Sequence, residues 1–291
     1  MSEAERLRVA VLGVGLMGSA IAAEYATAGH AVRITTSPAT SARTAMDRVA
    51  NHLDQLTRYG PARTEVRWLP STAEAAAGAD LVVESLPEVA AMKAAELAAA
   101  QTVAPAAILA SNTSSLALAT LGAGLADPTR LLGTHYLNPP TAFRVLELVQ
   151  GPATDPDVSD RMAAILRGIG KAPVLVRDVP GFVLNRLQLA LLREAVELVD
   201  GGVVSAADLD RLVRQGLGRR WSAVGPFGTV ALGGPATFRR VAEQLYPVLS
   251  CSQKPPDSLD RLDLDEEAIA ELRSARDQAL GGGWTDDQVE P

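Results

Sequence analysis

Short apolar runs alternate with longer stretches of helical pattern along roughly the first 180 residues of the chain. Each run consists mostly of Val, Leu, Ile and Ala, a pattern that predicts a strand buried on both faces of a sheet. Apolar residues recur at helical spacing between the runs, and a capping box at Ser71 and Glu74 predicts a further helix start. The predicted strands are 8–12, 31–35, 80–84, 107–110 and 174–179, and the clearest helices between them are 16–28 and 88–100.

This alternation of strands and helices predicts a parallel sheet with helices on both faces. After about residue 180 the strand pattern stops and helical spacing continues. We therefore expect an α/β domain over residues 1–179 and a smaller all-α domain over residues 180–291. The helical segments predicted in the second domain start at 181 and at a cap formed by Ser205 and Asp208, and cover 229–249 and 266–280.

A glycine-rich turn follows the first predicted strand and opens the first predicted helix. It reads Gly13-Val-Gly-Leu-Met-Gly18 and fits the pattern G-x-G-x-x-G in the strand–turn–helix context that the pattern requires. The first glycine allows the tight turn, the second lets the backbone approach a pyrophosphate, and the third lets the helix pack on the sheet. The sequence therefore predicts a Rossmann-like domain that holds a dinucleotide at a helix N-terminus. The predicted contacts of the turn are Gly13, Gly15, Leu16, Met17 and Gly18.

The end of the second predicted strand lacks the acid that usually accepts a hydrogen bond from the adenosine ribose 2′-hydroxyl. That acid is expected about 20 residues after the glycines, where this chain reads Thr35-Thr36-Ser37-Pro38. A carboxylate repels a 2′-phosphate whereas hydroxyls can donate to one, so Thr36 and Ser37 are compatible with NADP, and Arg43 offers an additional charge. Thr36 can equally contact the ribose of NAD, and the sequence leaves NAD and NADP open.

Charge and composition exclude several other classes of protein. The chain of 291 residues has 34 acidic and 27 basic residues and a net charge of −7, so binding to nucleic acid mainly through its phosphates is not expected. One cysteine, Cys251, allows no intramolecular disulfide and no Cys-based zinc site, and the three histidines are scattered, so no metal is predicted. We find no long apolar stretch and no secretory leader, and we expect a soluble cytoplasmic protein that is not bound to a membrane.

Four segments of the chain carry a resemblance to a known family. They are the Gly13 turn, Ser111-Asn-Thr-Ser-Ser-Leu116, Gly133-Thr-His-Tyr-Leu-Asn-Pro139 with Leu146-Glu-Leu-Val149, and Asp178-Val-Pro-Gly-Phe-Val-Leu-Asn-Arg186. In this order and spacing they resemble the 3-hydroxyacyl-CoA dehydrogenase family, from about residue 8 to about residue 250. The resemblance implies a nicotinamide-dependent oxidoreductase that interconverts a 3-hydroxy compound and its 3-keto form.

The resemblance also implies roles for individual residues. His135 matches the general base, and Glu147 matches the carboxylate that pairs with its imidazole. Ser114 and Asn185 match positions that contact the substrate oxygen, although Ser114 can alternatively cap a short helix that begins at Leu116. Three further positions match cofactor contacts, and the first two of them can alternatively form a solvated helix face: Glu88, Lys93 and Asn112.

These residue types suit the oxidation of a secondary alcohol. The reaction removes a hydride from carbon and a proton from oxygen, and neutral imidazole can accept that proton near neutral pH. A carboxylate fixes the tautomer of the ring and stabilises the imidazolium that forms. Hydrogen bonds from Ser114 and Asn185 would hold the oxygen so that the C–H bond points at the nicotinamide.

The substrate carrier is left open by the sequence. The segment Gly216-Leu-Gly-Arg-Arg-Trp-Ser-Ala-Val-Gly-Pro226 is similar to the branch of the family that acts on small free hydroxy acids such as gulonate and carnitine. Arg220 in this segment can bind a substrate carboxylate, or it can form a structural ion pair. Basic residues after the second strand can alternatively meet the phosphates of CoA or of a carrier-protein phosphopantetheine: Arg48, Arg58, Arg63 and Arg67.

The first long helix of the second domain is apolar on more than one face, from Phe182 to Leu198. Such a helix must be covered by neighbours, and in the family it resembles a partner subunit covers it, so a homodimer is expected. Burial within its own chain is the alternative. A different class of function is also kept, namely a cofactor-binding or structural family member without turnover. The intact set Ser114, His135, Glu147 and Asn185 favours an enzyme.

Overall fold

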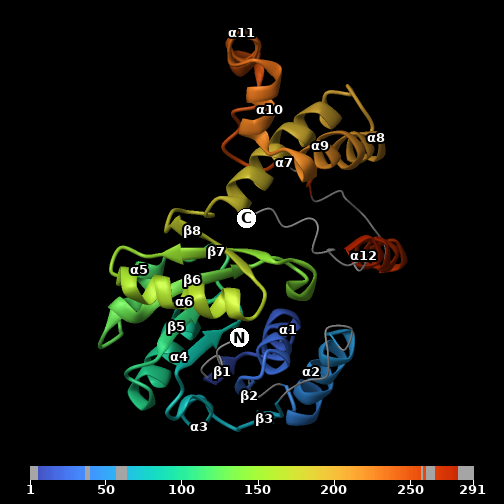
Figure 1. Ribbon diagram of the computed structural model, residues 1–291. Helices are drawn as coiled ribbons and strands as arrows, with labels where there is room; N and C mark the ends of the chain where they lie inside the picture. Colours follow the sequence, from blue (N-terminus) through green and yellow to red (C-terminus); the bar gives the residue numbers. More distant parts are fainter. Residues whose placement is uncertain (1–5, 37–39, 57–63, 257, 260–265, 281–291) are drawn as a thin grey trace. The chain divides into compact units, whose positions relative to one another are not determined.

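The computed structural model describes residues 6–36, 40–56, 64–256, 258–259 and 266–280. One compact unit is built mainly from Met1–Asn185 and the other from Arg186–Gln278. Figure 1 traces the strands and helices of each unit along the chain. None of the helices in the described part of the chain is both long and apolar enough to cross a membrane.

The first unit contains an eight-stranded sheet with the strand order β3-β2-β1-β4-β5-β6-β7-β8. All neighbouring strands run parallel except β6 and β7, which are antiparallel. The connection between these two strands is too short for the crossover that a parallel pair needs, so this pair departs from the predicted parallel arrangement. The strands are β1 (Arg8–Leu12), β2 (Ala31–Thr35), β3 (Val66–Trp68), β4 (Leu81–Glu84), β5 (Ile108–Ser111), β6 (Leu131–Tyr136), β7 (Val145–Gln150) and β8 (Ala172–Arg177).

Helices cover both faces of this sheet, which confirms the predicted α/β Rossmann-like class. Side chains of Val9 and Val11 lie in one core cluster with residues of α1, α2 and α6, whereas Ala10 and Leu12 lie in a second cluster with residues of α3, α4 and α5. Alternate residues of one strand therefore belong to opposite layers. The helices are α1 (Leu16–Thr27), α2 (Ala42–Leu56), α3 (Thr72–Ala76), α4 (Ala90–Val103), α5 (Leu118–Gly122) and α6 (Pro156–Gly168), with 3-10 turns η2 (Pro128–Arg130) and η3 (Pro140–Ala142).

The second unit is helical, as predicted, but its helices are shorter than the sequence pattern suggested. The helix expected from residue 181 begins at Leu184, and the stretch 229–249 is divided at Gly234, whose φ is +88°, and Pro235. Ser205 caps its helix by accepting a hydrogen bond from the Asp208 N–H, as expected. The elements are α7 (Leu184–Asp200), α8 (Ala206–Leu212), the π-helical η4 (Val213–Gly218), α9 (Arg219–Ala223), α10 (Pro226–Gly233), α11 (Pro235–Leu245), the 3-10 turn η5 (Tyr246–Val248) and α12 (Glu266–Leu280).

Candidate active site

The glycine turn between β1 and α1 has the shape that a pyrophosphate requires. Gly13 has a φ of +88° and donates its N–H to the Thr35 carbonyl over 3.0 Å. A Cβ on Gly13 would lie 2.7 Å from the Ser85 carbonyl oxygen, and a Cβ on Gly18 would clash with the Gly13 carbonyl oxygen. A Cβ on Gly15 would meet nothing within 4 Å, so the turn is open on that side. The turn thus fits a dinucleotide in the way that the glycine pattern implies.

The structure describes three of the four other predicted cofactor contacts near the glycine turn and the end of β2. Leu16 and Met17 open helix α1, Leu16 with a side chain that is 62% exposed and Met17 half-buried against the core. Thr36, directly after β2, donates its hydroxyl to the Thr40 carbonyl over 2.8 Å. Ser37 lies outside the described residues. Their roles toward a cofactor stay predictions.

His135 and Glu147 form a buried pair on the neighbouring strands β6 and β7. The antiparallel register of β6 and β7 places them directly opposite each other, and opposite residues point to the same face. His135 Nδ1 lies 2.7 Å from Glu147 Oε2, and the two residues are 6% and 3% exposed. With Nδ1 bonded to the carboxylate, Nε2 is the nitrogen that remains to accept a proton.

The segment that leads into α7 encloses this pair. The N–H groups of Val183 and Leu184 donate to Glu147 Oε1 over 2.8 and 3.0 Å. Phe182 has a positive φ of 50°, is 1% exposed, and its ring centroid lies 5.5 Å from that of His135. The sequence reading assigned Phe182 to the apolar face of a helix, which is wrong because the helix begins two residues later. The turn residues Pro180 and Gly181 were the available signal.

Ser114 is held from two sides, and it is connected to the same site. Asn185, in the first turn of α7, donates its side-chain amide to the Ser114 carbonyl over 2.9 Å. The Ser114 N–H donates to Glu88 Oε1, also over 2.9 Å. Helix α5 begins at Leu118 rather than at residue 116, so the alternative reading of Ser114 as its cap is wrong. The structure therefore brings Ser114, Asn185 and the His135–Glu147 pair together through successive contacts.

Glu88 and Lys93 belong to one ionic network, and the alternative of a solvated helix face is wrong for Lys93. Lys93 is fully buried, and its Nζ donates to both oxygens of Glu84 over 3.1 and 2.9 Å and to the Leu86 carbonyl over 3.0 Å. The same Nζ lies 3.3 Å from Glu88 Oε2. Glu84, which is also fully buried and accepts a hydrogen bond from the Ser111 hydroxyl, was missed, although an acid at the end of an apolar strand was visible in the sequence.

The environment of Glu88 keeps this carboxylate ionised. Partial burial opposes ionisation, but the hydrogen bond from the Thr113 hydroxyl, the charge of Lys93 and the hydrogen bonds from Ser114 and Ser115 outweigh it and lower the pKa of Glu88 to about 2. Thr113 donates to Glu88 Oε1 over 2.6 Å. Glu88 is thus an anionic anchor for the loop that contains Ser114.

Asn112 joins the ends of three strands. Its amide donates to the Ser85 hydroxyl over 3.2 Å, and its carbonyl oxygen accepts the Tyr136 N–H over 3.1 Å. Ser85 is also the residue against which Gly13 packs. Asn112 therefore fixes the β5 end between the glycine turn and the strand that contains His135.

Arg220 belongs to the second unit, where its side chain is exposed in α9, so the structure does not group it with the residues above.

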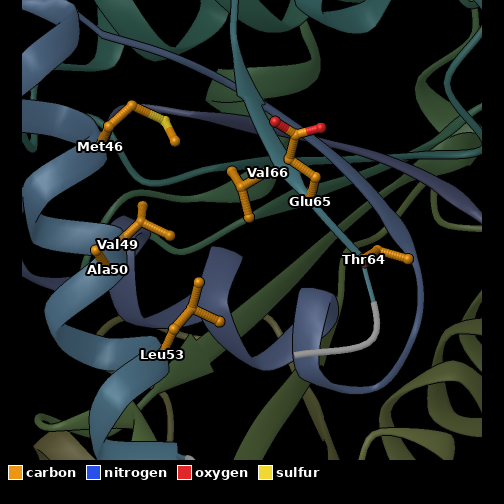
Figure 2. Close-up of a pocket in the computed structure, with 7 residues that line it drawn as sticks. All are labelled: Met46, Val49, Ala50, Leu53, Thr64, Glu65 and Val66. Carbon is orange, nitrogen blue, oxygen red and sulfur yellow. The ribbon is translucent and has the colours of Figure 1, made fainter. Parts of the chain in front are cut away.

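A hollow between α2 and β3 contains none of the predicted site residues and is mostly apolar (Figure 2). The lining of the hollow is Met46, Val49, Ala50, Leu53, Thr64, Glu65 and Val66.

Among the described residues, no group of three or more His, Cys, Asp or Glu side chains is placed to hold a metal ion.

Comparison with protein families gives two consecutive matches that cover most of the chain. Residues 8–179 match the NAD binding domain of 3-hydroxyacyl-CoA dehydrogenase, and residues 181–268 match its C-terminal domain. These matches confirm the resemblance inferred from the four sequence segments.

The individual relatives include dehydrogenases and lambda-crystallin homologs. A 5-formyl-3-hydroxy-2-methylpyridine 4-carboxylate 5-dehydrogenase of Mesorhizobium japonicum is 35% identical in sequence. The match covers 83% of this chain and 81% of that enzyme. A solved structure of an enzyme of that name, described as an NAD+-dependent dismutase, matches with a TM-score of 0.87 at 30% identity over 94% of this chain and 96% of that one. An L-carnitine dehydrogenase of Oceanobacillus iheyensis is 32% identical over 83% of this chain and 81% of that enzyme. A lambda-crystallin homolog of Bos taurus is 35% identical over 94% of this chain and 93% of that protein.

Proposed function

The chain belongs to the 3-hydroxyacyl-CoA dehydrogenase family and is a nicotinamide-dependent dehydrogenase. From this premise we propose that it interconverts a 3-hydroxy acid, free or as a thioester, and the corresponding 3-keto compound. The observation that carries the proposal is the buried contact of 2.7 Å between His135 and Glu147.

We propose His135 as the general base and Glu147 as its positioning carboxylate. In the oxidation, Nε2 takes the proton of the substrate hydroxyl, and the hydrogen on the same carbon leaves with the electron pair of the C–H bond, as a hydride that an oxidised nicotinamide would accept. The positive charge that forms on the ring is stabilised by Glu147, which Val183 and Leu184 hold in place by their N–H groups. In the reverse direction, the imidazolium returns the proton to the oxygen of the reduced product.

Ser114 and Asn185 are proposed to orient the substrate oxygen. The Ser114 side chain is exposed, whereas its backbone is fixed at the N–H by Glu88 and at the carbonyl by Asn185. A hydroxyl on a fixed backbone can donate to the oxygen without a large loss of conformational freedom. We propose two roles for Asn185. It fixes Ser114 through the hydrogen bond to the Ser114 carbonyl, and, as the family resemblance implies, it also contacts the substrate oxygen.

The cofactor is proposed to lie along the glycine turn and the end of β4. When bound, the nicotinamide ring supplies the hydride acceptor. The open side of Gly15 and the start of α1 at Leu16 suit the pyrophosphate. Because Lys93 is enclosed by Glu84, Glu88 and the Leu86 carbonyl, we propose that it acts on the cofactor mainly by fixing Glu88.

Small free carboxylic acids are the substrate class to test first. The relatives include enzymes named for a pyridine carboxylate and for carnitine, and Arg220 offers a guanidinium that can bind a carboxylate in bidentate fashion. Thioesters of CoA or of a carrier protein remain the second class. The proposal also includes a cytoplasmic location and a homodimer formed through the helical unit, whose α7 exposes Leu187 at 60% and Leu189 at 59%.

A panel of substrates tests this function. Free 3-hydroxy acids, their CoA thioesters and their carrier-protein thioesters are each incubated with NAD and with NADP, and formation of the reduced nicotinamide is followed by absorbance. We expect turnover with at least one class, and we expect the Arg220→Ala variant to raise KM for free acids more than for thioesters.

A non-catalytic role is the second candidate, because a lambda-crystallin homolog is among the relatives. Cofactor binding with no turnover on any member of the panel would support this candidate over the dehydrogenase. The intact pair of His135 and Glu147 favours the enzyme, because these are the residue types that a proton transfer from an alcohol requires.

A further inference from the structure

Arg48, on helix α2, reaches across to the glycine turn. Its Nη1 donates to the carbonyl oxygen of Val14 over 3.1 Å. A guanidinium has five N–H donors, and within the described part of the chain this is the one hydrogen bond that Arg48 makes, with no carboxylate as its partner. The side chain is otherwise exposed. A guanidinium is thus held beside the glycine turn with most of its N–H donors available.

The end of β2 lies against the same part of the turn. Gly13 donates its N–H to the Thr35 carbonyl over 3.0 Å, so the end of β2 meets the turn one residue before Val14, whose carbonyl oxygen Arg48 contacts. In a Rossmann-like fold, the adenosine ribose lies at this strand end. From residue 36 to residue 46 the sequence contains no Asp or Glu. The strand end therefore has a hydroxyl at Thr36 where NAD-specific folds place a carboxylate.

We infer that Arg48 binds the 2′-phosphate of NADP(H) and that the protein prefers NADP(H) over NAD(H). The inference rests on the proposed function, because it requires a nicotinamide dinucleotide on the glycine turn. A 2′-phosphate carries negative charge and acceptor oxygens, which a guanidinium fork binds through paired, charge-assisted hydrogen bonds. The ribose 2′-hydroxyl of NAD offers no charge to Arg48 and finds no carboxylate at Thr36.

Binding without substrate tests this inference separately from catalysis. NADPH or NADH is titrated into the purified full-length protein, and the fluorescence of the reduced nicotinamide reports the Kd. We expect tighter binding of NADPH, and we expect Arg48→Ala to weaken NADPH binding by about 10- to 100-fold and NADH binding by less than about threefold. Arg167→Ala, at an exposed arginine of α6, is the matched control and should change neither Kd.

A second variant reverses the preference. Thr36→Asp restores the acceptor for the ribose 2′-hydroxyl and repels a 2′-phosphate, so it should strengthen NADH binding and weaken NADPH binding by at least about tenfold. Tighter binding of NADH by the wild-type protein, or equal losses for both cofactors in Arg48→Ala, would overturn the inference and leave the proposed function intact. A folded protein that binds neither cofactor would overturn both.

Discussion

The two units of this protein differ in how far their charged and apolar side chains are buried. In the first unit, charged residues are enclosed with their partners: His135 with Glu147, Lys93 with Glu84, and Lys171 with Glu24. In the second unit, no described residue of Arg186–Gln278 is buried, and Phe227 is 90% exposed. One unit encloses these charged pairs, whereas the other leaves many of its large apolar side chains exposed.

This difference separates two kinds of function. Burial fixes the geometry of ionisable groups, because an unpaired charge in a sheet core is too costly to persist. The first unit is therefore suited to a preorganised proton transfer. An exposed apolar surface is instead typical of a contact that another surface covers. We connect the chemistry to the first unit and association to the second.

The largest effect is expected from the proposed catalytic pair, His135 and Glu147. His135→Ala removes the proposed base and should lower kcat by about 10²- to 10⁴-fold while cofactor Kd stays within about threefold. Steady-state kinetics on the best substrate of the panel, with a parallel cofactor titration, measures both. Glu147→Gln keeps an oxygen for the N–H groups of Val183 and Leu184, so it is the matched variant that changes charge with the smallest change in structure. Near-normal turnover by His135→Ala would break the link between the buried pair and the chemistry.

Stability should respond next, through the buried pair of Lys171 and Glu24. Lys171 Nζ lies 2.5 Å from Glu24 Oε1 and donates to the carbonyls of Pro140 and Phe143, each over 2.8 Å. Burial raises the pKa of Glu24, and Lys171 opposes that rise. Lys171→Met should therefore lower the free energy of unfolding of the first unit by about 3–5 kcal/mol, measured by urea denaturation.

Two controls sharpen this stability test. Adding Glu24→Gln to Lys171→Met removes the stranded carboxylate and should recover part of the loss. In the second unit, Arg211→Ala breaks the exposed ion pair with Asp208, whose contact is 2.6 Å, and should cost less than about 1 kcal/mol. Equal costs for the buried and exposed pairs would contradict the comparison of the units.

Association of the second unit provides the third prediction. We expect the wild-type protein to sediment as a dimer at micromolar concentration, and Leu187→Asp on α7 to weaken the dimer by at least about tenfold, because it places a charge on an exposed apolar face. Sedimentation velocity over a concentration series measures the shift, and Arg167→Ala in the first unit is the control. A wild-type monomer at these concentrations would show that the apolar surface has another purpose.

The smallest effect concerns Glu88 and pH. The pKa of Glu88 is lowered to about 2 in the folded protein, from an ordinary value of 4.5. Its stabilising contribution is therefore complete above about pH 4.5 and is lost as the pH falls towards 2. The Tm difference between wild type and Glu88→Gln should shrink over this window. Its side chain is 36% exposed, so solvent screening keeps the effect modest. Glu243→Gln, at an exposed position of α11, is the control.

Much of the first unit could be predicted from local sequence patterns. Apolar runs located β1, β2 and β4, and the glycine spacing located the turn after β1, because these features depend on neighbouring residues. The cap at Ser205 was found for the same reason. The strand β3, of three residues, and the antiparallel turn from β6 to β7 were not predicted, since short strands and strand direction leave little trace in periodicity.

The sequence by itself determined the Rossmann-like class, the family and the identity of the residues proposed for catalysis, because order and spacing along the chain are sufficient for these. Only the tertiary structure decided that Lys93 faces Glu84 and Glu88 rather than solvent, and that Phe182 covers His135. The same holds for the reach of Arg48 from α2 to the glycine turn. These contacts join residues whose partners come from other strands and helices, and burial energy, not local propensity, selects them.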